Sequence, residues 1–165
     1  VKGKQGMPFY SFSSDRAAWA SQIGSFSLKH VQKHFGYLGL TEQQGMATVK
    51  EQRVPCIALS EALAGGSGGL LMIDTEGLDC SIVASHNWCA EPRPQLLIYE
   101  HVHCGSEARG KAEKKLAAPC PNGGYTQLGL SGYNTVYRLG AQMAIDVELP
   151  ASWVPIRATG RADGR

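Results

Sequence analysis

The sequence predicts an α/β fold, and three features of its central and carboxyl-terminal parts carry that prediction. The first is a short apolar run, Leu70–Ile73, which is typical of a strand buried on both faces in a parallel sheet. The second is a similar run at Gln95–His101, with helix-like sequence between the two. The third is a pair of alternating segments within Tyr125–Leu139, which favours an antiparallel hairpin. Two parallel strands joined by a helix form a βαβ unit, and such units define the α/β class.

The amino-terminal third combines expected strands with short expected helices. Alternating apolar and polar residues predict the strands, and Pro55 suggests that the second of them is an edge strand or ends there. The helices are expected to begin near Ser14 or Asp15, at Ser27 and at Ser60, where a polar side chain can cap the first turn. The expected elements are strands at 7–13 and 48–55, helices at 15–22, 28–35 and 60–63, and a loop at 39–45.

A glycine run, Gly65–Gly69, has the composition of a phosphate-binding loop but not its position. Loops of that kind follow a strand and open a helix, so that the amino end of the helix faces the phosphate. Here the run follows an expected helix and precedes an expected strand, so we interpret it as a connector.

The remaining expected elements lie in the carboxyl-terminal third. Residues Ser106–Ala118 are rich in alanine, lysine and glutamate and are followed by Pro119, which predicts a helix. Strands are expected at Tyr125–Leu130 and Tyr133–Leu139. We expect one domain over residues 1–150 and a flexible tail over 151–165, because the tail contains few large apolar residues.

Length, composition and charge exclude several classes of function. The 165 residues suffice for one domain with a hydrophobic core, and 43% hydrophobic and 18% charged residues are ordinary for a globular protein. The formal net charge of +2 does not favour binding to nucleic acid or to a membrane surface, which usually requires a clustered basic excess. No apolar run approaches the roughly 20 residues of a membrane span. We therefore expect no nucleic-acid partner and no membrane span.

The five cysteines are irregularly spaced and contain no Cys-x-x-Cys pair, which argues against a structural zinc site. Buried free thiols are expected at each of them: Cys56, Cys80, Cys89, Cys104 and Cys120. Free thiols are typical of a reducing compartment, so an intracellular, cytoplasmic location is predicted, with an organelle as the alternative.

Polar side chains stand at the carboxyl ends of both central strands. Asp74, Thr75 and Glu76 follow the first strand, and Glu100 and His101 end the second. Open α/β sheets bind ligands at this edge, so we expect these side chains to line one ligand site. A structural role is compatible with that expectation, because Asp74 and Thr75 are also placed to cap the following helix.

Two histidine pairs raise the question of a metal. His30 and His34 are four residues apart and share a helix face, but no Glu follows His30 as the zinc-protease pattern requires. His101 and His103 are two apart and would share a strand face, where a carboxylate from the first strand end would complete a two-histidine, one-carboxylate site. Neither spacing is specific, so no residue is assigned as a metal ligand.

Several segments, in this order, resemble the carboxyl-terminal half of FkbM-family methyltransferases. They are Phe9-Tyr10, Trp19-Ala20, Gly24-Ser25-Phe26, His30-Val31 with His34, Val54–Ser60, Ile73–Val83 and Pro94–His101, so that the resemblance covers residues 8–138. It implies part of a class I, Rossmann-like sheet and methyl transfer from S-adenosylmethionine, mostly to hydroxyls of sugars, polyketides or similar small metabolites. By this analogy 70–74 and 95–101 are the fourth and fifth strands, and the closing hairpin supplies the last two, one antiparallel to the others.

The resemblance also suggests roles for the strand-end residues. Glu76, His101 and His103 are candidate catalytic bases for the acceptor hydroxyl, because burial can tune imidazole and carboxylate groups towards neutral pH. Asp74 and Thr75 are expected to contact the cofactor, with Asp74 orienting the acceptor or the amino group of S-adenosylmethionine.

One departure from the family pattern bears on function. Family members also contain a strand with a glycine-rich loop for the donor's methionine part, and a second strand whose terminal acid binds the ribose. Neither is recognised here, and residues 1–8 leave no room for them. We therefore expect either a fragment of a longer O-methyltransferase or a non-catalytic, methyltransferase-like structural or binding subunit. Whether the chain is itself an enzyme stays open.

This departure leads to two further expectations. The chain alone should bind S-adenosylmethionine weakly or not at all, while the acceptor remains its small-molecule partner. The hydrogen-bonding edge of the strand at 70–73 should be unpaired, so a protein partner or a second copy is expected to cover it.

Overall fold

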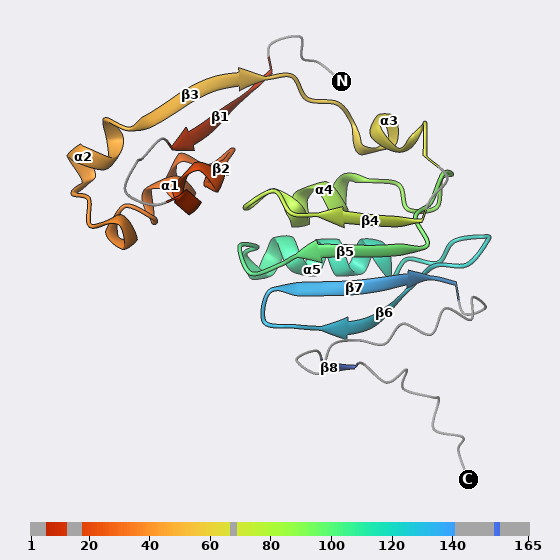
Figure 1. Cartoon of the computed structure of the whole chain (residues 1–165). Helices are drawn as coiled ribbons and strands as arrows, with labels where there is room; N and C mark the ends of the chain where they lie inside the picture. The colour runs from red at the N-terminus through yellow and green to blue at the C-terminus, as the bar shows by residue number, and fades with distance from the viewer. Residues whose placement is uncertain (1–5, 13–17, 67–68, 141–153, 156–165) are drawn as a thin grey trace.

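The elements of the computed structural model, which describes residues 6–12, 18–66, 69–140 and 154–155, form two separate sheets (Figure 1). The smaller sheet has the order β2-β1-β3, with β1 at Met7–Phe12, β2 at Gly24–Ser25 and β3 at Val49–Val54. Both pairings in it are antiparallel. The expected strands at 7–13 and 48–55 are therefore present, and β3 lies at an edge of this sheet, as Pro55 suggested.

The larger sheet contains the two central strands. Its order is β4-β5-β7-β6-β8, with β4 at Leu70–Ile73, β5 at Leu96–Glu100, β6 at Tyr125–Leu130, β7 at Asn134–Leu139 and β8 at Val154–Pro155. Strands β4 and β5 are parallel, whereas β7 is antiparallel to both β5 and β6. The mixed α/β class and the closing hairpin are thus confirmed.

Most helices are short, and several differ from expectation in their bounds. The α-helices are α1 (Leu28–Gln32), α2 (Glu42–Met46), α3 (Leu59–Leu63), α4 (Asp79–Ser85) and α5 (Ser106–Leu116), and the 3-10 helices are η1 (Ala18–Gln22) and η2 (Gly36–Leu38). Ser27 caps α1 as expected, because its side chain accepts a hydrogen bond from the His30 amide, but α1 ends before Phe35. The second half of the expected helix at 15–22 forms the 3-10 helix η1. Residues 13–17 lie outside the described part of the chain.

The prediction of a loop at 39–45 was wrong. Residues 42–46 form α2, which is held by a reciprocal capping box: the Thr41 side chain accepts from the Gln44 amide, and the Gln44 side chain accepts from the Thr41 amide. The sequence contains this signal, since a Thr stands three residues before a Gln, but Gly45 obscured it. Gly45 is required for packing here, because an added Cβ would lie 2.3 Å from Cδ2 of Phe35.

Helices α4 and α5 cover one face of the larger sheet (Figure 1). Val83 of α4 and Leu116 of α5 pack with Leu97 and Tyr99, the two side chains of β5 that point to this face. Trp88 is buried beside them and donates its Nε1–H to the Val83 carbonyl oxygen at 2.7 Å. A second core, around Phe12, Val31 and Phe35, belongs to the smaller sheet and its helices. The two central strands are therefore held from one side by a common apolar core.

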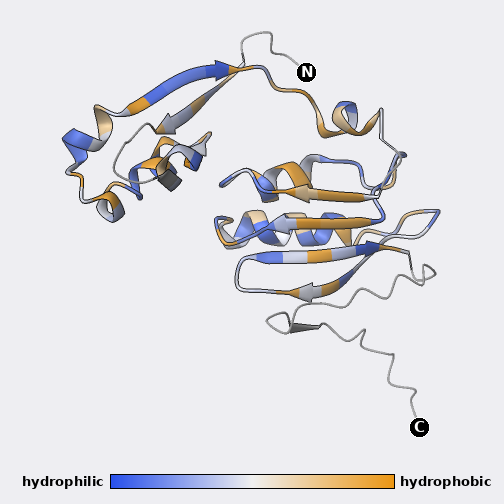
Figure 2. Cartoon of the chain, viewed as in Figure 1, coloured by the Kyte–Doolittle hydropathy of each residue, from blue (hydrophilic) through white to orange (hydrophobic). Residues whose placement is uncertain are grey.

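Strand β4 forms one edge of the larger sheet within the described residues. Figure 2 shows β4 as apolar along its length, whereas β3 is largely hydrophilic. The exposed fractions of Leu70 and Met72 are 62% and 57%. The expectation that the strand at 70–73 is buried on both faces was therefore wrong, because in the described residues α4 and α5 cover one face of the sheet and Leu70 and Met72 are exposed. The flexible tail expected at 151–165 lies outside the described residues, apart from Val154–Pro155, which pair with β6.

The helices in the described parts of the chain all fall short of the length and apolar character needed to cross a bilayer, in line with the expectation of no membrane span.

Candidate site at the carboxyl ends of the central strands

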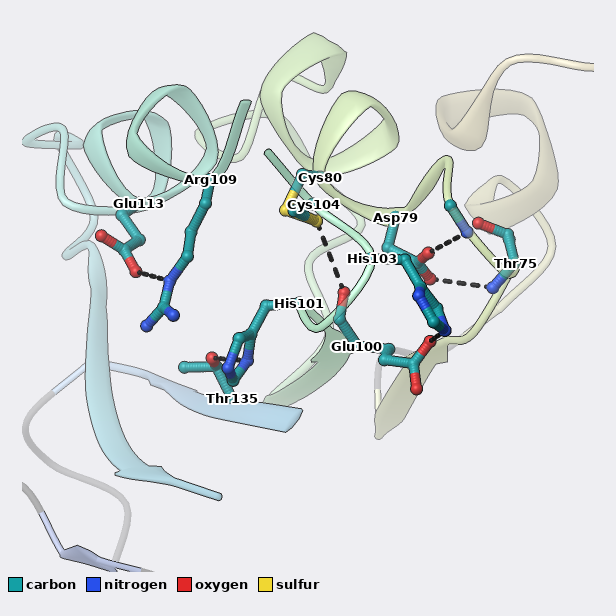
Figure 3. Close-up of a disulfide and its surroundings, with 11 residues drawn as sticks. Thr75, Asp79, Cys80, Glu100, His101, His103, Cys104, Arg109, Glu113 and Thr135 are labelled. Atoms are coloured by element: carbon teal, nitrogen blue, oxygen red, sulfur yellow. Dashed lines mark hydrogen bonds and ion pairs between the residues drawn. A yellow bond between two sulfur atoms is a disulfide. The ribbon is translucent and has the colours of Figure 1, made fainter. Parts of the chain in front are cut away.

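The turn between β4 and α4 is shaped by a buried carboxylate. Asp79, which is fully buried, accepts hydrogen bonds from the backbone amides of Thr75 at 2.8 Å and Gly77 at 3.1 Å (Figure 3). The expectation that Asp74 and Thr75 cap the following helix was wrong, because the N-cap of α4 is Leu78, without a side-chain hydrogen bond, and Asp79 instead holds the turn before the helix. The side chains of Asp74 and Thr75 are left for other contacts, and the Thr75 Oγ1 atom is buried without a hydrogen-bond partner in the described structure.

Glu76 adopts a backbone conformation that is unfavourable for its residue type. Its φ of +52° lies in the left-handed region, which costs a residue with a Cβ on the order of 1–2 kcal/mol. The Ser25 hydroxyl of the smaller sheet donates to the Glu76 carbonyl oxygen at 2.8 Å and helps to hold this conformation. Strain of this kind persists where the surroundings fix it, and it is concentrated at functional sites.

The Glu76 side chain brings two histidines together. Its Oε2 atom lies 3.0 Å from Nε2 of His30 and 3.3 Å from Nε2 of His103. The rings of His30 and His103 meet edge to face, with their centroids 4.5 Å apart. His30 comes from α1, Glu76 from the turn after β4, and His103 from the turn after β5. The cluster thus joins both strand ends of the larger sheet to a helix packed on the smaller sheet.

The His30 ring is neutral at physiological pH. Burial, together with the neighbouring His103, His34 and Lys33, lowers the pKa of His30 to about 4. The contact between Nε2 of His30 and Glu76 is therefore a hydrogen bond donated by a neutral ring, not an ion pair.

Carboxylates accumulate around this cluster. Burial, followed by the charges of Asp74, Glu76 and Asp79, raises the pKa of Glu100 to about 7. Burial also raises the pKa of Asp74, with further contributions from Glu76 and Asp79, although part of the Asp74 side chain is exposed to solvent. The Oε2 atom of Glu100 is buried without a hydrogen bond in the described structure, and the Nε2 atom of His103 lies 3.7 Å from it. Four carboxyl groups therefore lie close to the two imidazoles of the cluster.

His101 does not join this cluster. Its Nδ1 atom lies 3.0 Å from the Thr135 hydroxyl of β7, and its pKa is lowered by burial and by Arg109 of α5 (Figure 3). Strand β5 ends at Glu100, so residues 101–104 form a turn, and the alternation that was expected to place His101 and His103 on one face does not apply. The structure brings Asp74, Glu76 and His103 to the strand ends and directs His101 into the sheet.

Two hollows share Glu76 as a lining residue. The larger, of about 520 Å³, is also lined by Asp74, Thr75 and two aromatic rings of the smaller sheet, Phe9 and Phe26. These rings lie edge to face with centroids 5.2 Å apart. The smaller, of about 240 Å³, contains the two histidines of the cluster together with Lys29, Lys33 and Ser27.

Gly24 gives the larger hollow its aromatic wall. An added Cβ at this position would lie 2.6 Å from Cζ of Phe9, so only glycine lets that ring lie against β2.

Four of the five cysteines form disulfides, so the expectation of free thiols was wrong for them. Cys80 of α4 pairs with Cys104, and Cys89 pairs with Cys120, which leaves Cys56 as the free thiol. Sequence spacing gave no sign of either pairing, because the partners are 24 and 31 residues apart and meet only once α4, α5 and their loops have packed. The prediction of a reducing compartment rested on free thiols and loses that support. The Cys80–Cys104 bond ties the turn that carries His103 to α4 (Figure 3).

The sequence did not identify His30 as a partner of Glu76. His30 was noticed for its spacing from His34, yet its contacts are with residues 46 and 73 positions away, which no local pattern indicates. Its position three residues after the capping Ser27 is the one local signal that fixes its orientation.

Comparisons with protein-family models, with curated proteins and with solved structures found no match to this chain. The function therefore has to be argued from the geometry of the site.

Proposed function

We propose that this chain forms the acceptor-binding side of an O-methyltransferase site, on a Rossmann-like sheet of the kind that the resemblance to FkbM-family methyltransferases implies. The observation that carries the proposal is the position of the Glu76 carboxylate. It lies between a hollow with an aromatic wall, suited to the face of a small hydroxylated molecule, and the two imidazoles of His30 and His103. A strained acid beside a hollow at the carboxyl ends of parallel strands is in the place where α/β folds bind ligands.

The residues fit the implied donor only in part. When bound, S-adenosylmethionine supplies a methyl group whose carbon–sulfur bond breaks, leaving the electron pair on sulfur, as the new carbon–oxygen bond forms. Asp74 lines the hollow and offers its carboxylate to the donor's amino group, whereas the Thr75 Oγ1 atom is buried and is not open to a ligand. In the described parts of the chain, no glycine-rich loop follows a strand and opens a helix. The proposal therefore assigns acceptor binding and proton removal to this chain and expects the chain alone to bind the donor only weakly, so turnover is measured with S-adenosylmethionine in large excess.

Glu76 is the proposed base. Its carboxylate accepts the proton of the acceptor hydroxyl, and His103, whose Nε2 lies 3.3 Å away, is placed to relay that proton towards solvent. Phe9 and Phe26 orient the acceptor by covering its apolar face. His101 has no part in this scheme, because its ring is engaged with Thr135.

The test combines acceptor binding with turnover. The chain is screened by saturation-transfer NMR against monosaccharides and other small hydroxylated compounds, and binders are assayed for methylation with radiolabelled S-adenosylmethionine. We expect Glu76→Gln to keep acceptor affinity and to lose on the order of a hundredfold or more in turnover. Glu61→Gln, at an exposed glutamate of α3, serves as the matched control and should leave both unchanged. Equal turnover in Glu76→Gln and the parent would contradict the assignment of the base.

A non-catalytic binding subunit is the second candidate, and the exposed edge of β4 favours it. Leu70 and Met72 present apolar surface at a strand edge, where a partner chain can pair. If the parent chain bound an acceptor but did not methylate it, the result would support this candidate. If the chain neither bound nor methylated any acceptor, both candidate functions would be contradicted.

A further inference from the structure

We propose that His30, Glu76 and His103 bind a divalent first-row transition metal ion, with Zn²⁺ as the reference ion, at the junction of the two sheets. The inference does not rest on methyl transfer, because its test contains neither donor nor acceptor. With the ion bound, Nε2 of His103 would be a ligand and not a proton relay.

The geometry of the three side chains suits such an ion. One ligand atom from each residue lies within 4.8 Å of the other two, and the distances from Glu76 Oε2 to the two imidazole nitrogens are 3.0 and 3.3 Å. A tetrahedral Zn²⁺ with ligand bonds of about 2.0–2.1 Å holds its ligand atoms about 3.3 Å apart. The two Glu76–histidine distances therefore match those around such an ion, and the two imidazole nitrogens lie no more than 4.8 Å apart.

The chemistry of the donors selects the class of metal. Two imidazoles and one carboxylate suit zinc and related borderline ions, whereas calcium and magnesium prefer oxygen ligands alone. Three protein ligands leave a coordination position for water or a small ligand, as in catalytic zinc sites. Without the ion, Nε2 of His30 donates its hydrogen to Glu76, so binding would move the ring's one proton to Nδ1 and leave the Nε2 lone pair for the ion.

The surroundings favour a cation. The Oε2 atom of Glu100 is buried without a hydrogen bond, and Asp74 adds a further carboxylate near the cluster. Lys29 and Lys33, which line the smaller hollow, oppose a cation, but both side chains are exposed, so water screens their charge. A divalent ion would offset the repulsion among these acids more effectively than the lysines do, because it would lie among the carboxylates.

The ion would also join parts of the fold that the sheets leave separate. His30 belongs to a helix of the smaller sheet, and Glu76 and His103 belong to the larger one. In the described residues a direct hydrogen bond from Ser25 to Glu76 supports the same junction. Binding should therefore raise the thermal stability of the chain as well as fill the site.

The test is calorimetric titration of the whole chain with Zn²⁺, repeated with Co²⁺ while the visible absorption is recorded. We expect one ion per chain and a tetrahedral Co²⁺ spectrum. His30→Gln and His103→Gln should each weaken binding by roughly tenfold or more. His86→Gln is the matched control, because this histidine packs against Trp88 and lies outside the cluster, and the Zn²⁺ affinity of this variant should equal that of the parent. Since the side chain of His103 is already 29% exposed, His103→Gln keeps the test decisive if His30→Gln fails to fold.

Three results would overturn the proposal. The first is the absence of Zn²⁺ binding. The second is binding that survives in both His30→Gln and His103→Gln, or that is lost in Cys56→Ser, because the ion would then sit elsewhere. The third is binding of inorganic phosphate in place of Zn²⁺, which would make the lysines of the smaller hollow the binding groups.

Discussion

The two disulfides offer a prediction with a built-in control. We consider the double variants Cys80→Ala/Cys104→Ala and Cys89→Ala/Cys120→Ala. The cysteines of the two bonds are 24 and 31 residues apart. In the loop-entropy model, closing loops of these lengths stabilises the folded state by nearly equal amounts, about 3.5 kcal/mol each. The two variants should therefore lose nearly the same free energy of unfolding.

The two bonds differ in their distance from the candidate site. Cys104 follows His103 directly, whereas Cys89 and Cys120 join loops at the other end of the sheet. Loss of the Cys80–Cys104 bond should thus weaken Zn²⁺ binding, because the turn that positions His103 is no longer tied to α4. Loss of the other bond should leave Zn²⁺ affinity unchanged.

Thermal unfolding followed by circular dichroism, without reductant, measures the stability part. A loss of 3.5 kcal/mol corresponds to a decrease in Tm of about 7–14 °C for a domain of this size. Calorimetric Zn²⁺ titration of both folded variants measures the second part. A free energy of unfolding within about 1 kcal/mol of that of the parent, in either double variant, would contradict the stability part. An equal loss of Zn²⁺ affinity in both variants would contradict the second part.

Three further predictions follow from single residues. Glu76→Gly should be more stable than Glu76→Ala by about 1 kcal/mol in urea unfolding, since glycine tolerates the positive φ at this position; equal stability would show that the backbone there is unstrained. His86 is buried with a lowered pKa, caused by burial and then by Lys115, so the unfolded chain takes up a proton more readily than the folded one. The free energy of unfolding should then be highest above about pH 6.5 and decrease by up to about 1.4 kcal/mol per pH unit below it. The decrease should be shallower in His86→Gln, and parallel pH profiles of the two proteins would contradict this prediction. Met72→Lys should reduce self-association in sedimentation velocity if the β4 edge is the contact, and an unchanged distribution would locate any self-association elsewhere.

The elements that sequence reasoning placed well are those with local signals. The apolar runs of β4 and β5, the alternation in β6 and β7, and the capping Ser27 all act within a few residues. The capping box of α2 was equally local, but the glycine at position 45 concealed it. Local pattern thus accounts for the order of the elements and for the parallel pairing of β4 with β5.

The candidate site was predictable only in part. Asp74 and Glu76 were expected at the strand ends and lie there, because parallel strands bring their carboxyl ends to one edge. His101 and His30 were misjudged for the same physical reason, which is that their orientation depends on distant contacts. The Thr135 hydroxyl contacts the ring of His101, and the meeting of α1 with the turn after β4 brings His30 to Glu76. The disulfides escaped prediction because their cysteines meet only in the packed fold.

We infer that His30, His103 and the strained Glu76 form one ligand-binding site at the junction of the two sheets. X-ray absorption at the zinc edge, on the chain loaded with one equivalent of Zn²⁺, tests it most directly because it identifies the donor atoms. We expect a coordination shell of nitrogen and oxygen at about 2.0–2.1 Å with the outer-shell scattering of two imidazoles, reduced to one imidazole in His103→Gln. A sulfur shell at about 2.3 Å, or an imidazole signal that His103→Gln leaves unchanged, would contradict it.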